Sequence, residues 1–142
     1  MAEKFAFELV SPEKLLVAQQ VEMVVVPGGD GYFGVLKGHM SMLSTVQPGV
    51  IDVYEQRSAI SNRIFVTGGF AEVTPERCTV LAEHVVPVAS LDRAKVEQEL
   101  RDAEEDVADA KTPGETAVAE RALKLAKAKL YAVTRAATAG HA

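Results

Sequence analysis

The hydrophobic pattern of this chain changes once, between Pro87 and Ser90. Before this point, apolar residues alternate with polar ones in short segments separated by turn residues, which is typical of β-strands. After it, apolar residues recur every three or four positions in long charged segments, as they do in amphipathic helices. The sequence therefore predicts two modules, a β domain at residues 1–88 and a helical domain at residues 89–142.

Composition and charge exclude some classes of function. Of the 142 residues, 48% are hydrophobic and 25% are charged, which is ordinary for a soluble globular chain. The net charge of −5, without a basic cluster in the first module, argues against nucleic-acid binding. No apolar run approaches the ~18 residues that span a bilayer, and the N-terminus lacks the pattern of a secretory signal. We therefore expect a soluble protein that reaches a membrane only through other proteins.

Short alternating segments carry the β prediction. Phe5–Leu9 is apolar on one face, and Val21–Val26 is mostly β-branched, which predicts an inner strand ending at Pro27. Two hairpins are expected: Val50–Tyr54 with Arg63–Thr67, and Phe70–Val73 with Arg77–Glu83. Short strands about ten residues apart, without intervening helices, indicate an antiparallel β-sandwich or a flattened barrel. Cys78, alternating with Val80 and Ala82, is expected to be a buried thiol.

Residues 29–34 match the G-x-G-x-x-G pattern of dinucleotide sites, and Asp52 lies near the spacing of a ribose-binding acid. Such a site needs a helix that begins at the glycines, but Gly38 and Pro48 follow too soon for one. Lys37 is followed by Gly38 and His39, so the hydroxyl of a phosphate-binding loop is also missing. We expect these glycines to form tight turns.

No pattern predicts a catalytic or metal site. The three histidines, His39, His84 and His141, are far apart in the sequence, and neither an H-E-x-x-H motif nor a second cysteine is present. No serine lies in a G-x-S-x-G motif. We therefore expect no catalytic residues, no metal and no cofactor, so that function must be argued from surfaces.

The second module predicts a helical hairpin. We expect Ser90 to cap a first helix that begins near Leu91, with Asp92 at the positive end of the helix dipole. Thr112 and Glu115 match a capping box around a second helix start at Pro113. The apolar stripes are Val96, Leu100, Ala103, Val107 and Ala110 in the first helix, and Ala119, Leu123, Ala126, Leu130, Val133 and Ala137 in the second. Their matching spacing predicts two antiparallel helices.

The expected seam between these helices is weak. It holds three leucines among alanines and valines, and an alanine buries about one methyl group, worth ~0.8 kcal/mol. Residues 90–111 carry eight acids and four bases, whereas residues 115–142 carry two acids and five bases. This charge separation fits either attraction between the two helices or binding of an acidic partner. The hairpin is expected to be able to open.

Four segments together resemble the epsilon subunit of F-type ATP synthases. They are Gly31–His39, Gln47–Val50, Val66–Val73 and Thr79–Glu83. The resemblance extends over nearly the whole chain, through the order of these motifs, the length and the C-terminal helical pair. It implies a β-sandwich that binds the gamma subunit and the c-subunit ring as part of the rotor, without catalytic residues. It also implies a peripheral position on the cytoplasmic face of a bacterial inner membrane.

The resemblance also implies roles for particular residues. Asp30, Gly31, Tyr32 and His39 are expected to contact gamma or the c ring, near a turn at Gly68–Phe70; Lys37 stands where the family often has proline. The helical pair is expected to restrain ATP hydrolysis by reaching the alpha/beta catalytic head, with contacts from Lys124, Lys127, Lys129 and Arg135 to acidic segments of beta.

Some members of this family bind ATP at the start of the helical pair. The corresponding segment here, Leu91–Val96, has Lys95 and Val96 where the ATP motif has arginine and alanine. Asp92 and Lys95 form a degenerate version of that motif, and we expect helix capping rather than ATP binding there. Two other classes of function are considered: a sandwich that binds a nucleotide or another small molecule under a helical lid, and an enzyme with an unrecognised site.

Overall fold

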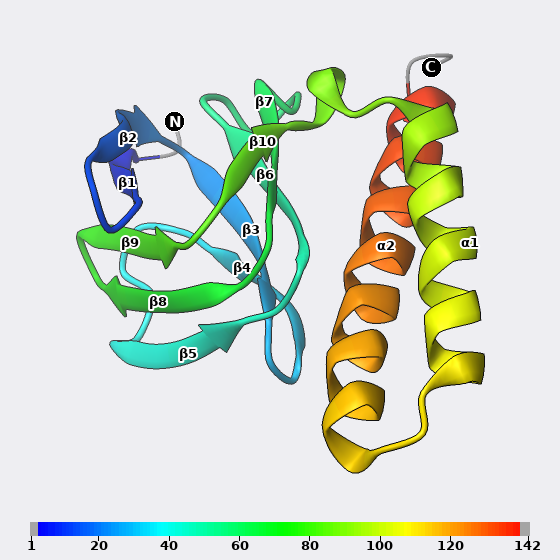
Figure 1. Cartoon of the computed structure of the whole chain (residues 1–142). Helices are drawn as coiled ribbons and strands as arrows, with labels where there is room; N and C mark the ends of the chain where they lie inside the picture. The colour runs from blue at the N-terminus through cyan, green and yellow to red at the C-terminus, as the bar shows by residue number, and fades with distance from the viewer. Residues whose placement is uncertain (1–2, 140–142) are drawn as a thin grey trace. The chain divides into compact units, whose positions relative to one another are not determined.

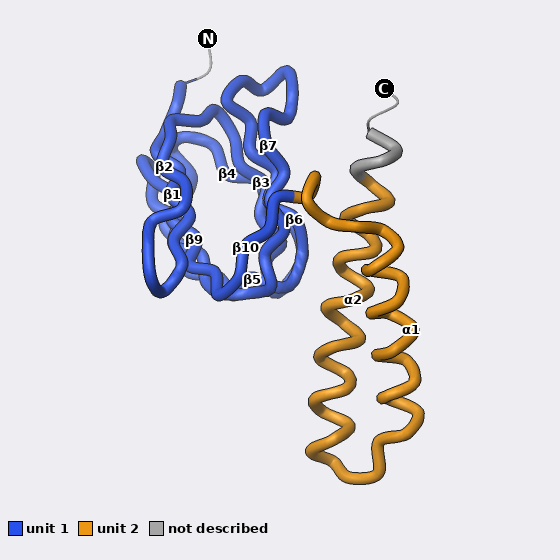
Figure 2. Tube along the Cα trace, turned by 45° about the horizontal axis from the view of Figure 1, so that its top comes forward, with its two compact units in different colours: residues 1–87 blue, residues 88–142 orange. Residues whose placement is uncertain are grey.

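The computed structural model describes residues 3–139 of the chain, with side chains through residue 135. The chain divides into two compact units, Met1–Pro87 and Val88–Ala142 (Figure 2). The first unit consists of strands and the second of two long helices that follow a short 3₁₀ turn (Figure 1).

Ten strands form the described part of the first unit. They are β1 Phe5–Val10, β2 Leu15–Val21, β3 Met23–Gly28, β4 Gly31–Val35, β5 Met42–Val46, β6 Gly49–Tyr54, β7 Asn62–Val66, β8 Gly69–Thr74, β9 Arg77–Ala82 and β10 Val85–Pro87. Their order in the sheet is β10-β7-β6-β3-β5-β8-β9-β1-β2, and β4 pairs with β3. Both predicted hairpins are confirmed, as β6 with β7 and as β8 with β9.

The sheet folds over on itself between β3 and β5, where Gly28 pairs with Val46. One layer contains β10, β7, β6, β3 and β4, and the other contains β5, β8, β9, β1 and β2. Inward-facing side chains from both layers form a single core, with Val24, Val26, Ile51 and Val53 from the first layer and Phe5, Phe7, Leu9, Val73 and Val80 from the second. The predicted β-sandwich is therefore confirmed.

The strands differ from the sequence prediction in three respects. Val21 ends β2, and β3 begins at Met23, because the chain turns at Glu22, whose carboxylate accepts a hydrogen bond from the Arg57 amide at 2.7 Å. The expected inner strand is present as β3, which pairs with β4 and β6, but its predicted start at Val21 is wrong. Pro27 belongs to β3, and its carbonyl accepts a hydrogen bond from Gln47 N at 2.8 Å. In addition, β1 and β9 pair in parallel, whereas the other strand pairs are antiparallel.

The second unit begins with the 3₁₀ turn η1, Val88–Ser90, followed by α1, Arg93–Asp109. The prediction that Ser90 caps α1 is wrong, because Ser90 lies inside the 3₁₀ turn, and the Leu91 amide bonds to the Val88 carbonyl. Asp92 is the N-cap instead. Its Oδ1 accepts hydrogen bonds from the amides of Ala94 at 2.9 Å and Lys95 at 3.4 Å.

The helix α2, Pro113–Ala139, begins where the capping box predicted. Thr112 Oγ1 accepts a hydrogen bond from the Glu115 amide at 3.1 Å. Glu115 Oε2 accepts one from the Lys111 amide at 2.9 Å, whereas in an ideal capping box it would accept the amide of Thr112 itself. The two helices pack against each other along the predicted seam, where Val96, Ala103, Ala119 and Ala126 are buried. The side chain of Ala137 lies outside the described residues.

Candidate functional site

The G-x-G-x-x-G segment forms a β-hairpin. Gly28 pairs with Gly31, so that Gly29 and Asp30 are the two loop residues between β3 and β4. Gly31 has φ of +129°, a conformation that side chains disfavour. A strand follows these glycines where a dinucleotide site needs a helix N-terminus. The segment therefore does not build a dinucleotide site.

The hairpin loop at Asp30 lies at one end of the sandwich. The Gly29 amide donates a hydrogen bond to the Thr45 carbonyl at 3.0 Å, and Gln47 Nε2 donates to the Gly29 carbonyl at 2.5 Å. Val46, which pairs with Gly28, also pairs with Gly69 of β8. The structure thus brings the Asp30 loop close to the start of β8 at Gly69.

His39 lies beyond the other end of β4. Its Nδ1 donates a hydrogen bond to the Met40 carbonyl at 2.7 Å, and the neighbouring Gly38 amide bonds to the carbonyl of Pro75, in the turn between β8 and β9. The length of β4, ~13 Å for four steps along a strand, separates this loop from Asp30. The structure therefore does not bring His39 together with Asp30, Gly31 and Tyr32.

A row of exposed apolar side chains crosses the outer face of one layer. Thr45 pairs with Phe70, Phe70 with Leu81, Leu81 with Val10, and Val10 with Leu15. Phe70 is 59% exposed, Leu81 46% and Leu15 54%, and Val10 is half-buried. We call Val10, Leu15, Phe70 and Leu81 the apolar row. It extends across β8, β9, β1 and β2.

The apolar row has neighbours typical of a protein interface. Leu43, 75% exposed, lies on the same face of β5, and polar groups border it where Arg77 and Thr79 contact the Glu8 carboxylate at 3.5 and 3.4 Å. An apolar centre with a polar rim is typical of protein–protein contacts. This surface was not predicted from the sequence, although one signal was present: Leu81 lies between the inward-facing Val80 and Ala82, and must therefore point outward.

The cysteine of the sandwich is sequestered from solvent. Cys78 is fully buried, and burial raises the pKa of its thiol to about 12, so the sulfur stays protonated and is a poor nucleophile. Among residues 3–139, no three His, Cys, Asp or Glu side chains are grouped so as to hold a metal ion. No helix in the described part of the protein combines the length and the apolar content needed to cross a membrane.

The start of α1 holds the degenerate ATP motif. The Asp92 carboxylate is engaged in capping the helix, and Arg93 Nε pairs with Glu97 Oε1 at 3.0 Å. Lys95 is exposed. The arrangement therefore assigns Asp92 a structural role as the helix cap.

The four basic residues predicted to reach a partner differ in availability. Lys124 and Lys127 are exposed on α2. Lys129 Nζ lies 3.1 Å from Glu99 Oε2 of α1, and its side chain is largely covered. The Arg135 guanidinium lies 6.0 Å from the centre of the Tyr131 ring. The two oppositely charged helices are thus joined by an ion pair between Lys129 and Glu99.

Comparison with known proteins covers both units. The family described as "ATP synthase, Delta/Epsilon chain, beta-sandwich domain" matches residues 4–88, and the family of C-terminal domains of the ATP synthase epsilon subunit matches residues 92–139. The ATP synthase epsilon chain of Rhodospirillum centenum is 54% identical over 134 residues, which is 92% of either protein. That of Paramagnetospirillum magneticum is 50% identical over 133 residues, covering 94% of this protein and 99% of the relative.

Solved structures share the same fold. A subunit in the cryo-EM structure of the Euglena gracilis mitochondrial ATP synthase, OSCP/F1/c-ring, superposes with a TM-score of 0.81 at 20% identity, covering 97% of this protein and 83% of that one. A subunit from the Tetrahymena thermophila mitochondrial ATP synthase central stalk and c ring has a TM-score of 0.66 at 14% identity, covering 93% and 98%.

Proposed function

The chain belongs to the ATP synthase epsilon chain family, and on this premise we propose that it is a non-catalytic central-stalk subunit of an F-type ATP synthase. In this role the sandwich, residues 1–88, joins gamma to the c-subunit ring, and the helical hairpin, residues 89–142, is a regulatory arm. The protein is peripheral to the bacterial inner membrane, on its cytoplasmic face, and is held there by its partners.

The apolar row is the observation that carries the proposal for the sandwich. Phe70, Leu81 and Leu15 expose large apolar side chains on one face, and a free protein gains nothing from leaving them in water. Burying them against another protein is favourable by roughly 25 cal/mol for each Å² removed from water. We assign this face to gamma, the partner that a rotor subunit must hold firmly while torque is transmitted.

The two loops at the ends of β4 serve as further contacts in the proposal. Asp30, Gly31 and Tyr32 are exposed at one end, and His39 lies in the loop beyond the other. Their separation along the strand favours two distinct contacts, shared between gamma and the c ring, over a single one. The His39 ring already donates to its neighbouring carbonyl, so its contribution there is to shape the loop.

For the arm, we propose that α2 restrains ATP hydrolysis through contacts with acidic segments of the alpha/beta head. Of the four predicted residues, Lys124 and Lys127 are the two that are exposed and can make such contacts in the hairpin as it stands. Lys129 first has to leave Glu99. In this exchange Lys129 replaces one carboxylate partner by another, so its charge stays paired.

Binding to a gamma-containing head tests the proposal for the sandwich. The full-length protein is titrated into the catalytic head of the Rhodospirillum rubrum enzyme, whose epsilon chain is 50% identical to this one, after its own epsilon subunit is removed. We expect one copy to bind per head. Replacing Phe70 and Leu81 together by serine is expected to raise the Kd about 10- to 100-fold, because buried apolar anchors dominate interface energies.

The matched control is Ile60→Ser, which removes a partly exposed apolar side chain from the loop between β6 and β7, in the other layer of the sandwich. It is expected to leave the Kd within about twofold, and circular dichroism verifies that all variants remain folded. Equal binding by the Phe70/Leu81 variant and the wild type would remove the apolar row from the interface. Failure of the wild type to bind would contradict the rotor role itself.

A further inference from the structure

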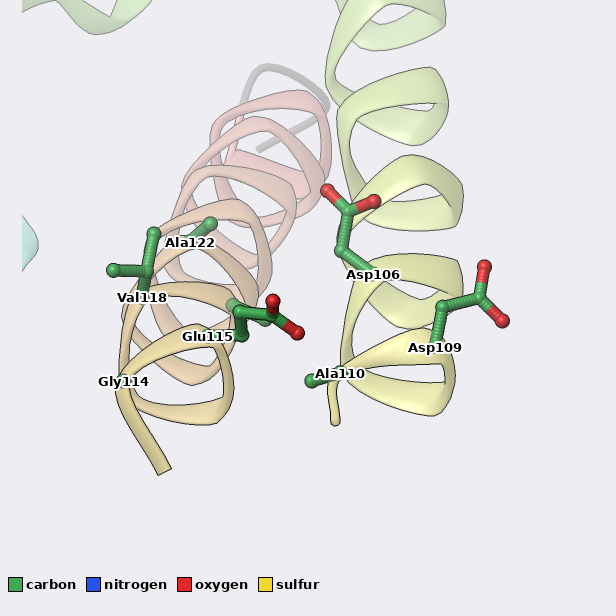
Figure 3. A pocket seen from close by; sticks show the side chains of 8 residues that line it. Asp106, Asp109, Ala110, Gly114, Glu115, Val118 and Ala122 are labelled. Carbon is green, nitrogen blue, oxygen red and sulfur yellow. The ribbon is translucent and has the colours of Figure 1, made fainter. Parts of the chain in front are cut away.

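An open groove runs along one side of the helical hairpin. At the turn, residues from the end of α1 and the first turns of α2 enclose about 710 Å³; the lining includes Asp106, Ala110, Val118 and Ala122 (Figure 3). A second hollow of about 250 Å³ is lined by Glu99, Asp102, Ala103, Asp106, Ala122, Leu125 and Ala126. Because Asp106 and Ala122 line both, the two hollows form one continuous groove.

The floor of the groove is apolar. It is made of alanines from both helices together with Val118 and Leu125 of α2. Val118 is 59% exposed, although it belongs to a helix whose inner stripe already packs against α1. Val118, Ala122 and Leu125 are spaced by four and three residues, so α2 has a second apolar stripe beside the seam. Val118 and Ala122 of this stripe stay exposed in the hairpin, and Leu125 is half-buried.

The rim of the groove is acidic. Glu99, Asp102, Asp106 and Asp109 recur at spacings of three, four and three residues, which places them along one edge of α1. Glu99 is paired with Lys129, and Asp102 accepts a hydrogen bond from Gln98. Within residues 3–139, neither Asp106 nor Asp109 has an ion pair. Figure 3 shows Asp106 and Glu115 directed toward the space between the helices, and Asp109 at the outer edge.

These carboxylates occupy the wrong end of α1 for stability. The C-terminal end of a helix carries partial negative charge, which favours cations, yet the last turn of α1 contains no basic residue. Asp106 and Asp109 therefore weaken the isolated helix. A cationic group that binds in the groove would relieve the repulsion between these carboxylates and the negative end of α1. The charges therefore favour a cationic ligand over a neutral or anionic one.

We propose that this groove binds a cationic amphipathic helix from another protein. The lining extends over α1 from residue 99 to residue 110, about 16 Å of helix, which matches three turns of a partner helix. The apolar side of that helix would cover Val118, Ala122 and Leu125, and lysines or arginines three and four residues apart would face the acidic rim. This is the helix-in-groove mode of recognition, and it does not depend on the rotor role of the sandwich.

A synthetic helical peptide tests this inference on the full-length protein. The probe has leucines along one face and lysines on the flanking positions, and its counterpart has glutamates in place of the lysines. We expect the lysine probe to bind with a Kd of tens of micromolar and to shift amide resonances of Val118, Ala122 and Leu125, and the glutamate counterpart to bind at least 10-fold more weakly. Binding should weaken as salt is raised, because exposed charges are screened.

Two pairs of variants separate groove binding from general attraction to an acidic protein. Asp102→Asn with Asp106→Asn is expected to raise the Kd of the lysine probe at least fivefold. The control, Glu104→Gln with Glu105→Gln, removes the same charge from residues that do not line the groove, and should change the Kd less than twofold. Equal weakening by both pairs, or shifts that map elsewhere, would overturn the inference.

Sedimentation velocity of the protein without peptide tests whether the groove is instead occupied by a second copy of this chain. A monomer at all concentrations agrees with a groove that receives a different protein. A dimer that the Asp102/Asp106 variant abolishes would contradict the proposal, since the occupant would then be a second copy.

Discussion

At the scale of single residues, Gly69 is a position that the fold constrains tightly. Its φ is +151°, and a Cβ at this position would overlap the carbonyl oxygen of Leu81 on the paired strand. Gly34, also in a strand, has open space around it and no such φ. The contrast shows that Gly69 allows β8 and β9 to approach closely at the end of the sandwich where the Asp30 loop lies.

We therefore expect Gly69→Ala to lower the free energy of unfolding of the sandwich by about 2 kcal/mol, because a strained backbone alone costs ~1–3 kcal/mol. The buried Cys78 thiol serves as a reporter, since its pKa of about 12 keeps it unreactive until the sandwich opens. At pH 8, labelling of this thiol should become about 30-fold faster in the variant.

Gly34→Ala provides the control, and it is expected to leave the labelling rate within about threefold of the wild type. If Gly69→Ala were labelled as slowly as Gly34→Ala, the close approach at Leu81 would not limit stability.

At the scale of elements, the start of α1 is defined by a single carboxylate. Asp92 Oδ1 accepts two amide hydrogen bonds of the first turn, and these donors have no partner within the helix. A nucleotide that used the same carboxylate would compete with the cap. The sequence motif fits both helix capping and ATP binding, and the hydrogen bonds of Asp92 show the capping role.

We expect Asp92→Ala to destabilise the first turn of α1 by about 1 kcal/mol, the usual value of an N-cap. Hydrogen exchange at the amides of Ala94, Lys95 and Val96 should become about fivefold faster. Asp92→Asn is the matched control, because asparagine caps helices about as well as aspartate and removes only the charge. Protection of these amides by added ATP in the wild type would instead support a nucleotide site.

At the scale of the whole molecule, the basic residues of α2 can be used to test the proposed restraint on ATP hydrolysis. Lys124 and Lys127 are exposed, whereas Lys129 is held by Glu99. Lys124 and Lys127 should therefore make the first contacts with an acidic surface of the catalytic head. Contacts of this kind are weak one by one, so any restraint on hydrolysis should be partial and sensitive to salt.

We expect Lys124→Gln with Lys127→Gln to raise ATP hydrolysis by the reconstituted Rhodospirillum rubrum head about two- to fivefold, since two exposed ion pairs together are worth about 1 kcal/mol. Lys4→Gln with Lys14→Gln, which removes the same charge from exposed positions on the sandwich, should leave the rate unchanged. An unaltered rate in the Lys124/Lys127 variant would remove the arm's braking role while leaving the gamma contact intact.

Local signals explain which parts of the fold could be predicted. The hairpins β6–β7 and β8–β9 and the start of α2 at Pro113 follow from turn residues, caps and periodicity, all of which act over a few residues. The errors have both distant and local causes. Glu22 divides two strands and bonds to Arg57, 35 residues away in the sequence. Ser90 lost the capping position because a 3₁₀ turn precedes the helix.

The surfaces were less predictable than the elements, for a physical reason. Phe70 and Leu15 are 55 positions apart, and they join one apolar row only because β8, β9, β1 and β2 pair in that order, including the parallel pair of β1 with β9. The groove similarly needs α1 and α2 side by side, so that Asp106 and Ala122 share its lining. Neither feature has a signature within any single segment.

The sequence alone determined the two-module organisation, the type of each long element and the family resemblance, because hydrophobic period, turn residues and helix caps act locally. The tertiary structure decided which exposed side chains share a face, that Glu99 of α1 engages Lys129 of α2, and that His39 and Asp30 lie at opposite ends of β4. These properties depend on strand register and helix pairing, which bring together residues that no local pattern relates.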